Sequence, residues 1–163
     1  MRQLFLVRHA QAESGAAGQS DFDRVLTAKG RGDAADAGFF LKDKNFFPDK
    51  ILVSPAKRTR ETFALLKNAF SHEAQVIFDE DIYNASFDTL QQLIASADED
   101  VQRLMIVGHN PGMHTIAMYY AAANTSVASF SPATVCVLEF KNSWHELPRR
   151  SGAIIALHMP ETE

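Results

Sequence analysis

The sequence predicts an α/β domain built as a three-layer sandwich, with a central, mostly parallel sheet flanked by helices. Short apolar runs typical of buried strands alternate along the chain with longer segments typical of helices, which is the pattern of a layered α/β domain. The length of 163 residues, of which 46% are hydrophobic and 22% are charged, fits one globular domain over residues 1–163.

Six short apolar runs are the predicted strands, and four segments between them are the predicted helices. The strands are expected at residues 4–7, 51–53, 75–78, 104–107, 135–140 and 153–157, and the run at 75–78 is the weakest of them. The helices are expected at residues 30–42, 56–70, 87–97 and 112–123. Turn-forming residues separate the last two strands, so we expect the C-terminal end of the sheet to be partly antiparallel.

The composition argues against several classes of protein. A net charge of −4 at pH 7 lacks the basic balance that a general grip on nucleic acid needs. The single cysteine, Cys136, cannot form an internal disulfide and is too little for a thiolate metal cage. No run approaches the ~20 apolar residues that span a bilayer, and the only early apolar run stops at Arg8. We therefore expect a cytoplasmic protein, a monomer or weak dimer, that binds neither nucleic acid nor a membrane.

Three of the predicted strands end in residues that can do chemistry. The first runs into Arg8 and His9, the second is followed by Arg58, and the fourth runs into His109. Parallel strands carry their carboxyl ends on one edge, where ligands of open α/β sheets bind, so we expect these side chains to converge. Two arginines and two histidines without an acidic cluster form an anion site. Helices starting after the second and fourth strands would add N–H groups and positive dipole ends.

A histidine in such a field can act as a nucleophile toward phosphorus. A neutral imidazole nitrogen can attack the phosphorus atom and become phosphohistidine, which divides hydrolysis into two steps. Nearby arginines stabilise charge on the phosphoryl oxygens and disfavour the imidazolium form. A carboxyl group must then protonate the leaving atom and later activate water. The sequence offers candidates for that group in Asp79, Glu80 and Asp81, after the third strand.

The motifs that carry these residues resemble those of one known family. Residues 6–10 (LVRHA) resemble the Arg-His-Gly motif of the histidine phosphatase, or phosphoglycerate mutase-like, superfamily, with Ala10 in place of the glycine. Residues 54–62 (SPAKRTRET) resemble its Ser-Pro-x-x-Arg-Ala-x-Gln-Thr segment, and residues 107–112 (VGHNPG) its second-histidine motif. The short length and residues 23–31 (DRVLTAKGR) resemble the SixA-type branch, the phosphohistidine phosphatases.

The resemblance implies a role for each matching residue. His9 would be the nucleophile that becomes phosphorylated, and Arg8 and Arg58 would bind the phosphoryl group together with His109 as the second pocket histidine. Glu80 falls where larger members of the superfamily place their proton donor. From the residues alone that choice stays open between Glu80, Asp81 and neither. The expected fold is the phosphoglycerate mutase-like sandwich.

The leading hypothesis is a metal-independent phosphatase that acts through phosphohistidine at His9, on a phosphohistidine protein. One alternative is a small-molecule phosphomonoesterase or a mutase of the same superfamily. A mutase needs a closed site that excludes water, and the chain offers no inserted lid segment between the motifs. An alternative of another class is a binding module that recognises phosphate without turnover, although such a module needs no nucleophile.

Other histidines and charges are given plainer interpretations. His109 and His114 are five positions apart with no glutamate between them, unlike helical zinc motifs, so we expect no metal and no other cofactor. His114 keeps a possible role because it lies one turn into the helix that follows His109. Arg60 is out of register with the motif arginine, and we expect it on the surface.

Overall fold

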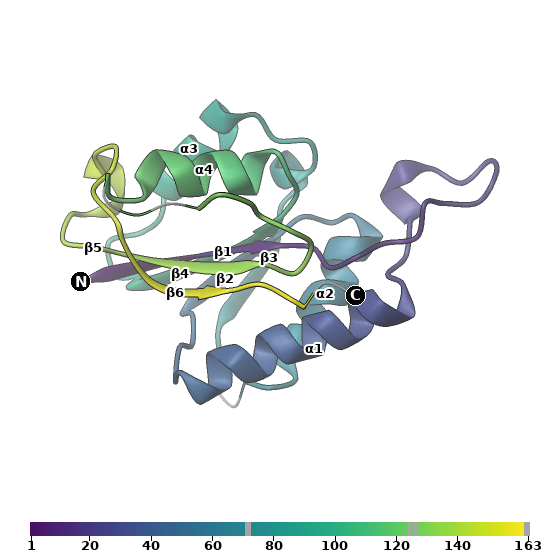
Figure 1. Cartoon of the computed structure of the whole chain (residues 1–163). Coiled ribbons are helices and arrows are strands. Elements are labelled where there is room, and N and C mark those ends of the chain that lie inside the picture. Colours follow the sequence, from purple (N-terminus) through teal and green to yellow (C-terminus); the bar gives the residue numbers. More distant parts are fainter. Residues whose placement is uncertain (71–72, 124, 126, 162–163) are drawn as a thin grey trace.

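The centre of the computed structural model, which describes residues 1–70, 73–123, 125 and 127–161, is one six-stranded sheet (Figure 1). The strands lie in the order β3-β2-β4-β1-β5-β6. Their bounds are β1 (Arg2–Arg8), β2 (Lys50–Val53), β3 (Gln75–Phe78), β4 (Arg103–Gly108), β5 (Val135–Phe140) and β6 (Ala153–His158). The first four pair in parallel, whereas β5 runs antiparallel to both β1 and β6. The predicted mixed sheet is therefore confirmed.

Helices cover both faces of the sheet. One face carries α1 (Ala28–Asp43) and α2 (Lys57–Lys67), and the other carries α3 (Phe87–Ala95) and α4 (Gly112–Tyr120) (Figure 1). Short 3-10 helices, η1 (Asp21–Asp23), η2 (Glu80–Ile82) and η3 (Trp144–Glu146), lie in the connections. The predicted three-layer sandwich is confirmed.

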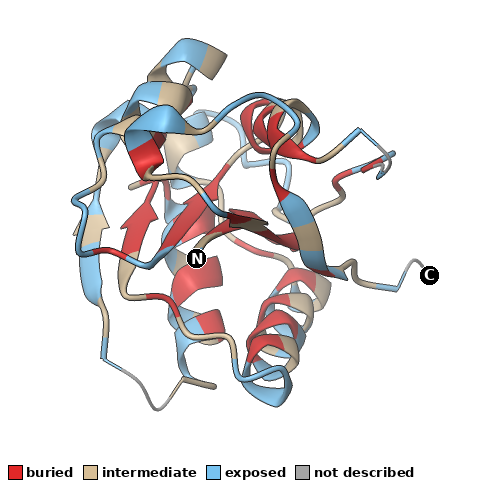
Figure 2. Ribbon diagram, turned by 90° about the vertical axis from the view of Figure 1, so that its left-hand side faces the viewer, coloured by how far each residue is buried: buried red, intermediate tan, exposed pale blue. Residues whose placement is uncertain are grey.

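Alternation along β1 divides the core into two layers. Phe5 and Val7 pack in the cluster that contains the α1 and α2 side chains, whereas Leu4 and Leu6 pack in the cluster that contains those of α3 and α4. Buried residues accordingly lie in the sheet and on the helix faces turned toward it (Figure 2). Cys136 is a buried free thiol inside β5. In the described part of the chain, no helix combines the length and apolar character needed to cross a membrane.

The predicted end of α4 is wrong for a tertiary reason. The helix was expected to continue to residue 123, but it ends at Tyr120, and Ala121 is extended. The backbone of Ala122 donates to the carbonyl of Gly152, and the N–H of Gly152 donates to the carbonyl of Tyr120. This pairing with a distant segment takes up the backbone groups at the helix end. The helices α2 and α3 also end earlier than predicted, at Lys67 and Ala95.

Between β1 and α1 the chain leaves the body of the molecule as residues 11–27, which we call the projecting loop (Figure 1). Ala12 forms an antiparallel bridge with Leu26 at its base. The N–H of Leu26 donates to Oε1 of Glu61, which ties the loop to α2. The helix η1 belongs to this loop.

The register of the three central parallel strands brings the predicted site residues to one edge. Arg8 lies opposite Gly108 across the pairing of β1 with β4, and Val53 lies opposite Val107 across that of β2 with β4. The N–H of His9 continues the ladder by donating to the carbonyl of Gly108 (2.9 Å). The residues that follow these three strands therefore lie side by side.

Two glycines in α1 give a test of how the projecting loop is packed. A Cβ on Gly30 would lie 2.1 Å from the carbonyl oxygen of Gln11, whereas a Cβ on the exposed Gly32 would meet nothing within 4 Å. We expect Gly30→Ala to lower the free energy of unfolding by about 1–3 kcal/mol, because backbone must move to admit the methyl group. Gly32→Ala is expected to raise it by about 0.5–1 kcal/mol, because alanine favours the helix.

Urea unfolding monitored by circular dichroism measures both values. Equal stabilities of the two variants would contradict the close packing of Gln11 against α1.

Candidate active site

The structure brings Arg8, His9, Arg58 and His109 together at the carboxyl edge of the sheet. The rings of His9 and His109 have their centroids 5.3 Å apart. Arg58 lies in the first turn of α2 and is buried, as is His9 (5% and 8% exposed). The positive charges of Arg58 and Arg8 both act on His9. The structure therefore brings together residues from three distant motifs, as the sequence predicted.

The ring of His9 is held with one nitrogen free. Its Nδ1 lies 2.7 Å from the carbonyl oxygen of Ala10, which can only accept, so Nδ1 carries the proton and Nε2 is the unprotonated nitrogen. Burial lowers the pKa of His9 to about 4, and the charges of Arg58, Arg8 and Arg24 also lower it, against the hydrogen bond to Ala10. At neutral pH the imidazole is therefore uncharged, as a nucleophile must be.

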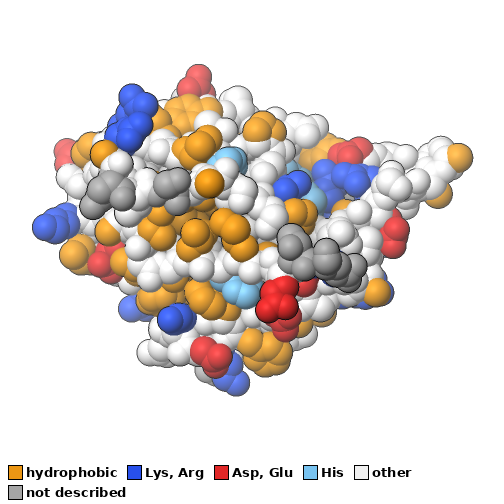
Figure 3. Space-filling view, viewed as in Figure 1, with side chains coloured by type: hydrophobic (Ala, Val, Ile, Leu, Met, Phe, Trp, Pro, Cys, Tyr) orange, Lys and Arg blue, Asp and Glu red, His pale blue; other side chains and the backbone are white. Residues whose placement is uncertain are grey.

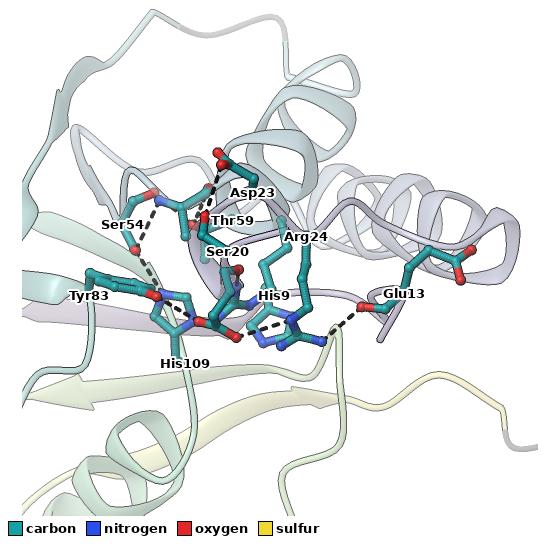
Figure 4. Close-up of polar contacts among 12 residues, drawn as sticks. His9, Glu13, Ser20, Asp23, Arg24, Ser54, Thr59, Tyr83 and His109 are labelled. Atoms are coloured by element: carbon teal, nitrogen blue, oxygen red, sulfur yellow. Dashed lines mark hydrogen bonds and ion pairs between the residues drawn. The ribbon is translucent and has the colours of Figure 1, made fainter. Parts of the chain in front are cut away.

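His109 is held by the serine of the second motif. Its Nε2 lies 2.7 Å from Oγ of Ser54 (Figure 4), and the same Oγ accepts a hydrogen bond from the N–H of Ala56. When the Ser54 hydroxyl donates to Nε2, the proton of the neutral ring sits on Nδ1, which can then donate to a ligand. Burial lowers the pKa of His109 to about 3, helped by the charges of His9 and Arg58.

Three buried nitrogens of these side chains have no hydrogen-bond partner among the described residues. They are Nε of Arg8, Nε of Arg58 and Nδ1 of His109. An unsatisfied buried donor costs about 1–3 kcal/mol, so three at one site need an explanation. An anion with several acceptor oxygens would satisfy all of them. The cluster therefore has the chemistry of an anion site.

Arg8 and Arg58 are oriented by backbone carbonyls. Nη1 of Arg8 donates to the carbonyl of Phe130 (3.0 Å), which also accepts a hydrogen bond from Nδ2 of Asn110. Nη1 of Arg58 donates to the carbonyl of Asp21 (2.7 Å). A guanidinium held through one edge presents its remaining N–H groups in a fixed fork.

Thr62 connects the first two motifs through its hydroxyl. The N–H of Ala10 donates to Oγ1 of Thr62, which in turn donates to the carbonyl of Arg58. Ala10 is fully buried, and its φ is not in the left-handed region. The alanine in place of the motif glycine is therefore accommodated without backbone strain.

Three residues that no sequence motif predicted lie beside the site: Asp21, Arg24 and Tyr83. Nη2 of Arg58 donates to Oδ2 of Asp21 (3.1 Å), the hydroxyl of Tyr83 donates to the same oxygen (2.6 Å), and Nε of Arg24 donates to Oδ1 (3.0 Å). The ring of Tyr83 lies edge-on to that of His109, with centroids 5.6 Å apart (Figure 4). Asp21 had no signal of its own, because it lies in a polar loop of ordinary composition.

Glu80 is not brought to the four basic residues. It begins η2 as an exposed residue, and within the described ranges no hydrogen bond or ion pair joins its side chain to Arg8, His9, Arg58 or His109. Asp81 is also exposed. The role of Glu80 as proton donor stays a prediction. The neighbouring segment contributes Tyr83 instead.

Two other sequence interpretations can be compared with the structure. Arg60 is exposed on α2, as expected. Nε2 of His114 lies 2.8 Å from the carbonyl of Val127, so His114 anchors that loop rather than reaching His9. Within the described residues, no group of three or more His, Cys, Asp or Glu side chains has the arrangement of a metal site.

The sandwich and its site define an enzyme that handles phosphoryl groups through histidine. A family model described as the histidine phosphatase superfamily (branch 1) matches residues 4–110. A phosphohistidine phosphatase SixA homolog of Haemophilus influenzae is 34% identical over 155 residues, covering 88% of this chain and 92% of the relative. A chloroplast protein of Arabidopsis thaliana is 32% identical, covering 93% of this chain and 72% of the relative.

Solved structures agree with the sequence relatives. A candidate phosphohistidine phosphatase SixA from Nakamurella multipartitia superposes with a TM-score of 0.84 at 26% identity, covering 99% of this chain and 97% of that one. The protein histidine phosphatase SixA in complex with tungstate has the same fold, with a TM-score of 0.78 at 18% identity over 95% of both chains. The chain therefore belongs to the histidine phosphatase superfamily, in its SixA-type part, and is a phosphatase.

The lowered pKa values of the two histidines predict an NMR result. We expect the imidazole nitrogens of His9 and His109 to keep the shifts of neutral rings when the pH falls from 8 to about 5.5, because their pKa values are about 4 and about 3. In the unfolded chain in urea, both should titrate near the ordinary value of 6.5.

This difference also fixes the sign of a stability effect. Below pH 6.5 the unfolded chain binds protons that the folded chain does not, so these two histidines lower the free energy of unfolding as the pH falls toward about 3. Folded-state titration of His9 with a midpoint near 6.5 would refute the lowered pKa.

Proposed function

We propose that this phosphatase removes a phosphoryl group from histidine in another protein, through a phosphohistidine intermediate on His9. The observation that supports it most is the set of unpartnered nitrogens at one site. Nε of Arg8, Nε of Arg58 and Nδ1 of His109 are buried donors without partners among the described residues. They surround an imidazole whose Nε2 carries no proton and whose charge is suppressed by burial.

The reaction divides into two displacements at phosphorus. In the first, the lone pair of Nε2 of His9 forms an N–P bond as the bond from phosphorus to the leaving atom breaks, and the leaving atom takes a proton. In the second, a water oxygen forms a bond to phosphorus as the N–P bond breaks, and the water gives up a proton. Inorganic phosphate leaves, and Nε2 regains its lone pair.

Arg8, Arg58 and His109 lower the barrier of both steps electrostatically. Their N–H groups face the equatorial phosphoryl oxygens, over which charge is spread in the transition state. The hydrogen bonds to the carbonyls of Phe130 and Asp21 hold the two guanidinium groups before substrate arrives. Such preorganisation avoids the cost of arranging donors during the reaction. The protein groups that act in these two steps are all side chains, so neither step requires a metal ion.

An open site supports a protein substrate. Basic and histidine side chains gather at the surface between the body of the molecule and the projecting loop (Figure 3). The carboxyl group of Asp21, which bonds Arg58 directly, is 52% exposed. A phosphorylated side chain projecting from a folded partner can reach such a site. The SixA homolog of Haemophilus influenzae bears the name of a phosphohistidine phosphatase, which is consistent with this choice.

A small phosphomonoester is the second candidate, and one cavity favours it. A pocket of about 260 Å³ opens beside His109, with Asn84 and Asn110 as polar lining and Leu90 and Met113 as apolar lining. It could hold the organic part of a compact substrate. A mutase and a non-catalytic binding module are less well supported, because the site is open and the nucleophile is present. A cytoplasmic location and a monomer or weak dimer stay predictions.

The covalent intermediate is directly testable. After incubation with a ³²P-labelled phosphohistidine protein and a rapid quench, we expect label on the enzyme that survives alkali and is lost in acid, because a phosphoramidate behaves in this way. His9→Ala should abolish the label. Arg58→Gln should lower kcat/KM by on the order of 10²–10³-fold, as loss of one transition-state donor does.

Two controls accompany this measurement. Arg60→Gln removes an exposed charge from the same helix and should leave the rate unchanged. A chelator should also have no effect. Label on a residue other than His9, or activity only with an added divalent ion, would overturn the mechanism.

The substrate class requires a comparison of rates. We expect kcat/KM on a phosphohistidine protein to exceed that on free phosphohistidine and on simple phosphomonoesters, because the open site fits a projecting side chain. Higher kcat/KM on a small phosphomonoester would favour the second candidate, and Leu90→Ala, which alters the pocket beside His109, should then change KM.

A further inference from the structure

Asp21 is the carboxylate most closely joined to the basic site. Its Oδ2 accepts from Nη2 of Arg58 and from the hydroxyl of Tyr83, and its Oδ1 accepts from Nε of Arg24. Its charge acts on His109, although the two residues are far apart in the sequence, and in the fold both have Tyr83 as a neighbour. Within the described residues, Asp21 is thus an acidic group whose charge reaches the histidine pair.

The other nearby carboxylates lack this connection. Asp23 shares η1 with Asp21, but its Oδ2 accepts a hydrogen bond from Oγ of Ser20 and points into the loop (Figure 4). Glu61 is engaged by the N–H of Leu26. Glu80 and Asp81 are exposed on η2. Oδ1 of Asp79 accepts a hydrogen bond from the N–H of Asp81 at the start of η2. Geometry therefore separates Asp21 from these other acids.

We propose that Asp21 is the acid–base residue of the reaction, giving a proton to the leaving atom in the first step and taking one from water in the second. This inference rests on the proposed function and assigns the proton donor that it leaves open. It places the donor in the projecting loop rather than in the segment after β3, where Glu80 lies.

The backbone of Asp21 is fixed independently of its carboxyl group. Nη1 of Arg58 donates to the carbonyl oxygen of Asp21 (2.7 Å), so the arginine holds the main chain as well as the side chain. The base of the projecting loop is closed by the bridge between Ala12 and Leu26. The carboxyl group can therefore change its protonation state, or exchange its contact with Arg58, while the residue stays beside the site.

Substrate binding favours the protonated form of Asp21, which is the form that can donate a proton. In the free site the hydrogen bond from Tyr83, followed by that from Arg58, holds the pKa of Asp21 at about 2. The charged and titratable groups that face it are Tyr83 beside η2, Arg58 on α2 and Arg24 in its own loop. A phosphoryl group that takes the N–H groups of Arg58 removes one of these partners and adds a like charge, and both changes raise the pKa of the carboxyl group.

The proton balance is then complete. As the N–P bond to His9 forms and the bond to the leaving atom breaks, the protonated carboxyl of Asp21 gives its proton to the leaving atom and becomes a carboxylate. As water attacks phosphorus and the N–P bond breaks, the carboxylate takes the proton from water. After phosphate departs, the carboxyl group returns to solvent the equivalent of the proton that it took up from solvent on substrate binding, and the hydrogen bonds to Arg58 and Tyr83 form again.

The test compares Asp21→Asn with Asp23→Asn on two substrates whose leaving groups differ in basicity. With phenyl phosphate, which has a basic leaving group, Asp21→Asn should lower the rate of His9 phosphorylation by on the order of 10²–10⁴-fold, because the leaving oxygen has no proton donor. With 4-nitrophenyl phosphate, a far better leaving group, the same step should fall by less than about 10-fold. Asp23→Asn should match the wild type on both.

A second readout follows from the base role. With 4-nitrophenyl phosphate, Asp21→Asn should accumulate acid-labile phosphohistidine on His9, because the second step has lost its proton acceptor. Circular dichroism and urea unfolding establish that the variant is folded. The charge-conserving Asp21→Glu should recover part of the phenyl phosphate rate.

The outcomes separate the inference from the proposed function. Equal losses of Asp21→Asn on both substrates, without accumulation of phosphohistidine, would mean that Asp21 only positions Arg58. A wild-type rate in Asp21→Asn together with a leaving-group-dependent loss in Glu80→Gln would return the role to Glu80. Either result overturns the inference while His9 remains the labelled residue, whereas a wild-type enzyme that never carries label on His9 overturns the proposed function itself.

Discussion

The parallel pairing of β4 with both β1 and β2 is the constraint on which the site depends. Because these strands end at one edge in matched register, the residues that follow them meet although they belong to distant parts of the chain. The buried layers on both faces fix that register, since a slip of one residue would move each side chain of a strand from one buried layer into the other. The positions of His9 and His109 thus follow from packing well away from the chemistry.

The arrangement of the site lowers the free energy of unfolding but keeps the side chains in a reactive state. His9 is buried and His109 is half-buried, and loss of solvation together with nearby arginines suppresses the charge of both rings. Three nitrogens are left without partners among the described residues. Buried donors of this kind destabilise the folded state unless a ligand accepts hydrogen bonds from them. Backbone carbonyl groups hold both guanidinium groups in place. The carbonyl of Phe130 accepts a hydrogen bond from Arg8, and that of Asp21 accepts one from Arg58. The anion that completes the hydrogen bonds is then bound without rearrangement of its donors.

Asp21 and Tyr83 extend the site beyond the basic residues. They come from the projecting loop and from the segment that follows η2, which are separate in sequence and meet in a hydrogen bond of 2.6 Å. Through Arg58 this pair is connected to α2, and through the ring of Tyr83 it contacts His109. The basic residues and the acidic residue beside them are therefore parts of one connected network of contacts.

The order of strands and helices along the chain, the layered fold and the four basic residues could all be predicted from the amino-acid sequence. These signals are local: apolar runs, helical segments, and polar residues placed directly after strands. It did not determine where α4 ends, because a backbone pairing with Gly152 decides that. Nor did it single out Asp21, whose partners Arg58 and Tyr83 lie 37 and 62 positions away. Only the tertiary structure decides which carboxylate meets the site, because that choice depends on how a loop folds back against α2 and not on any pattern within the loop.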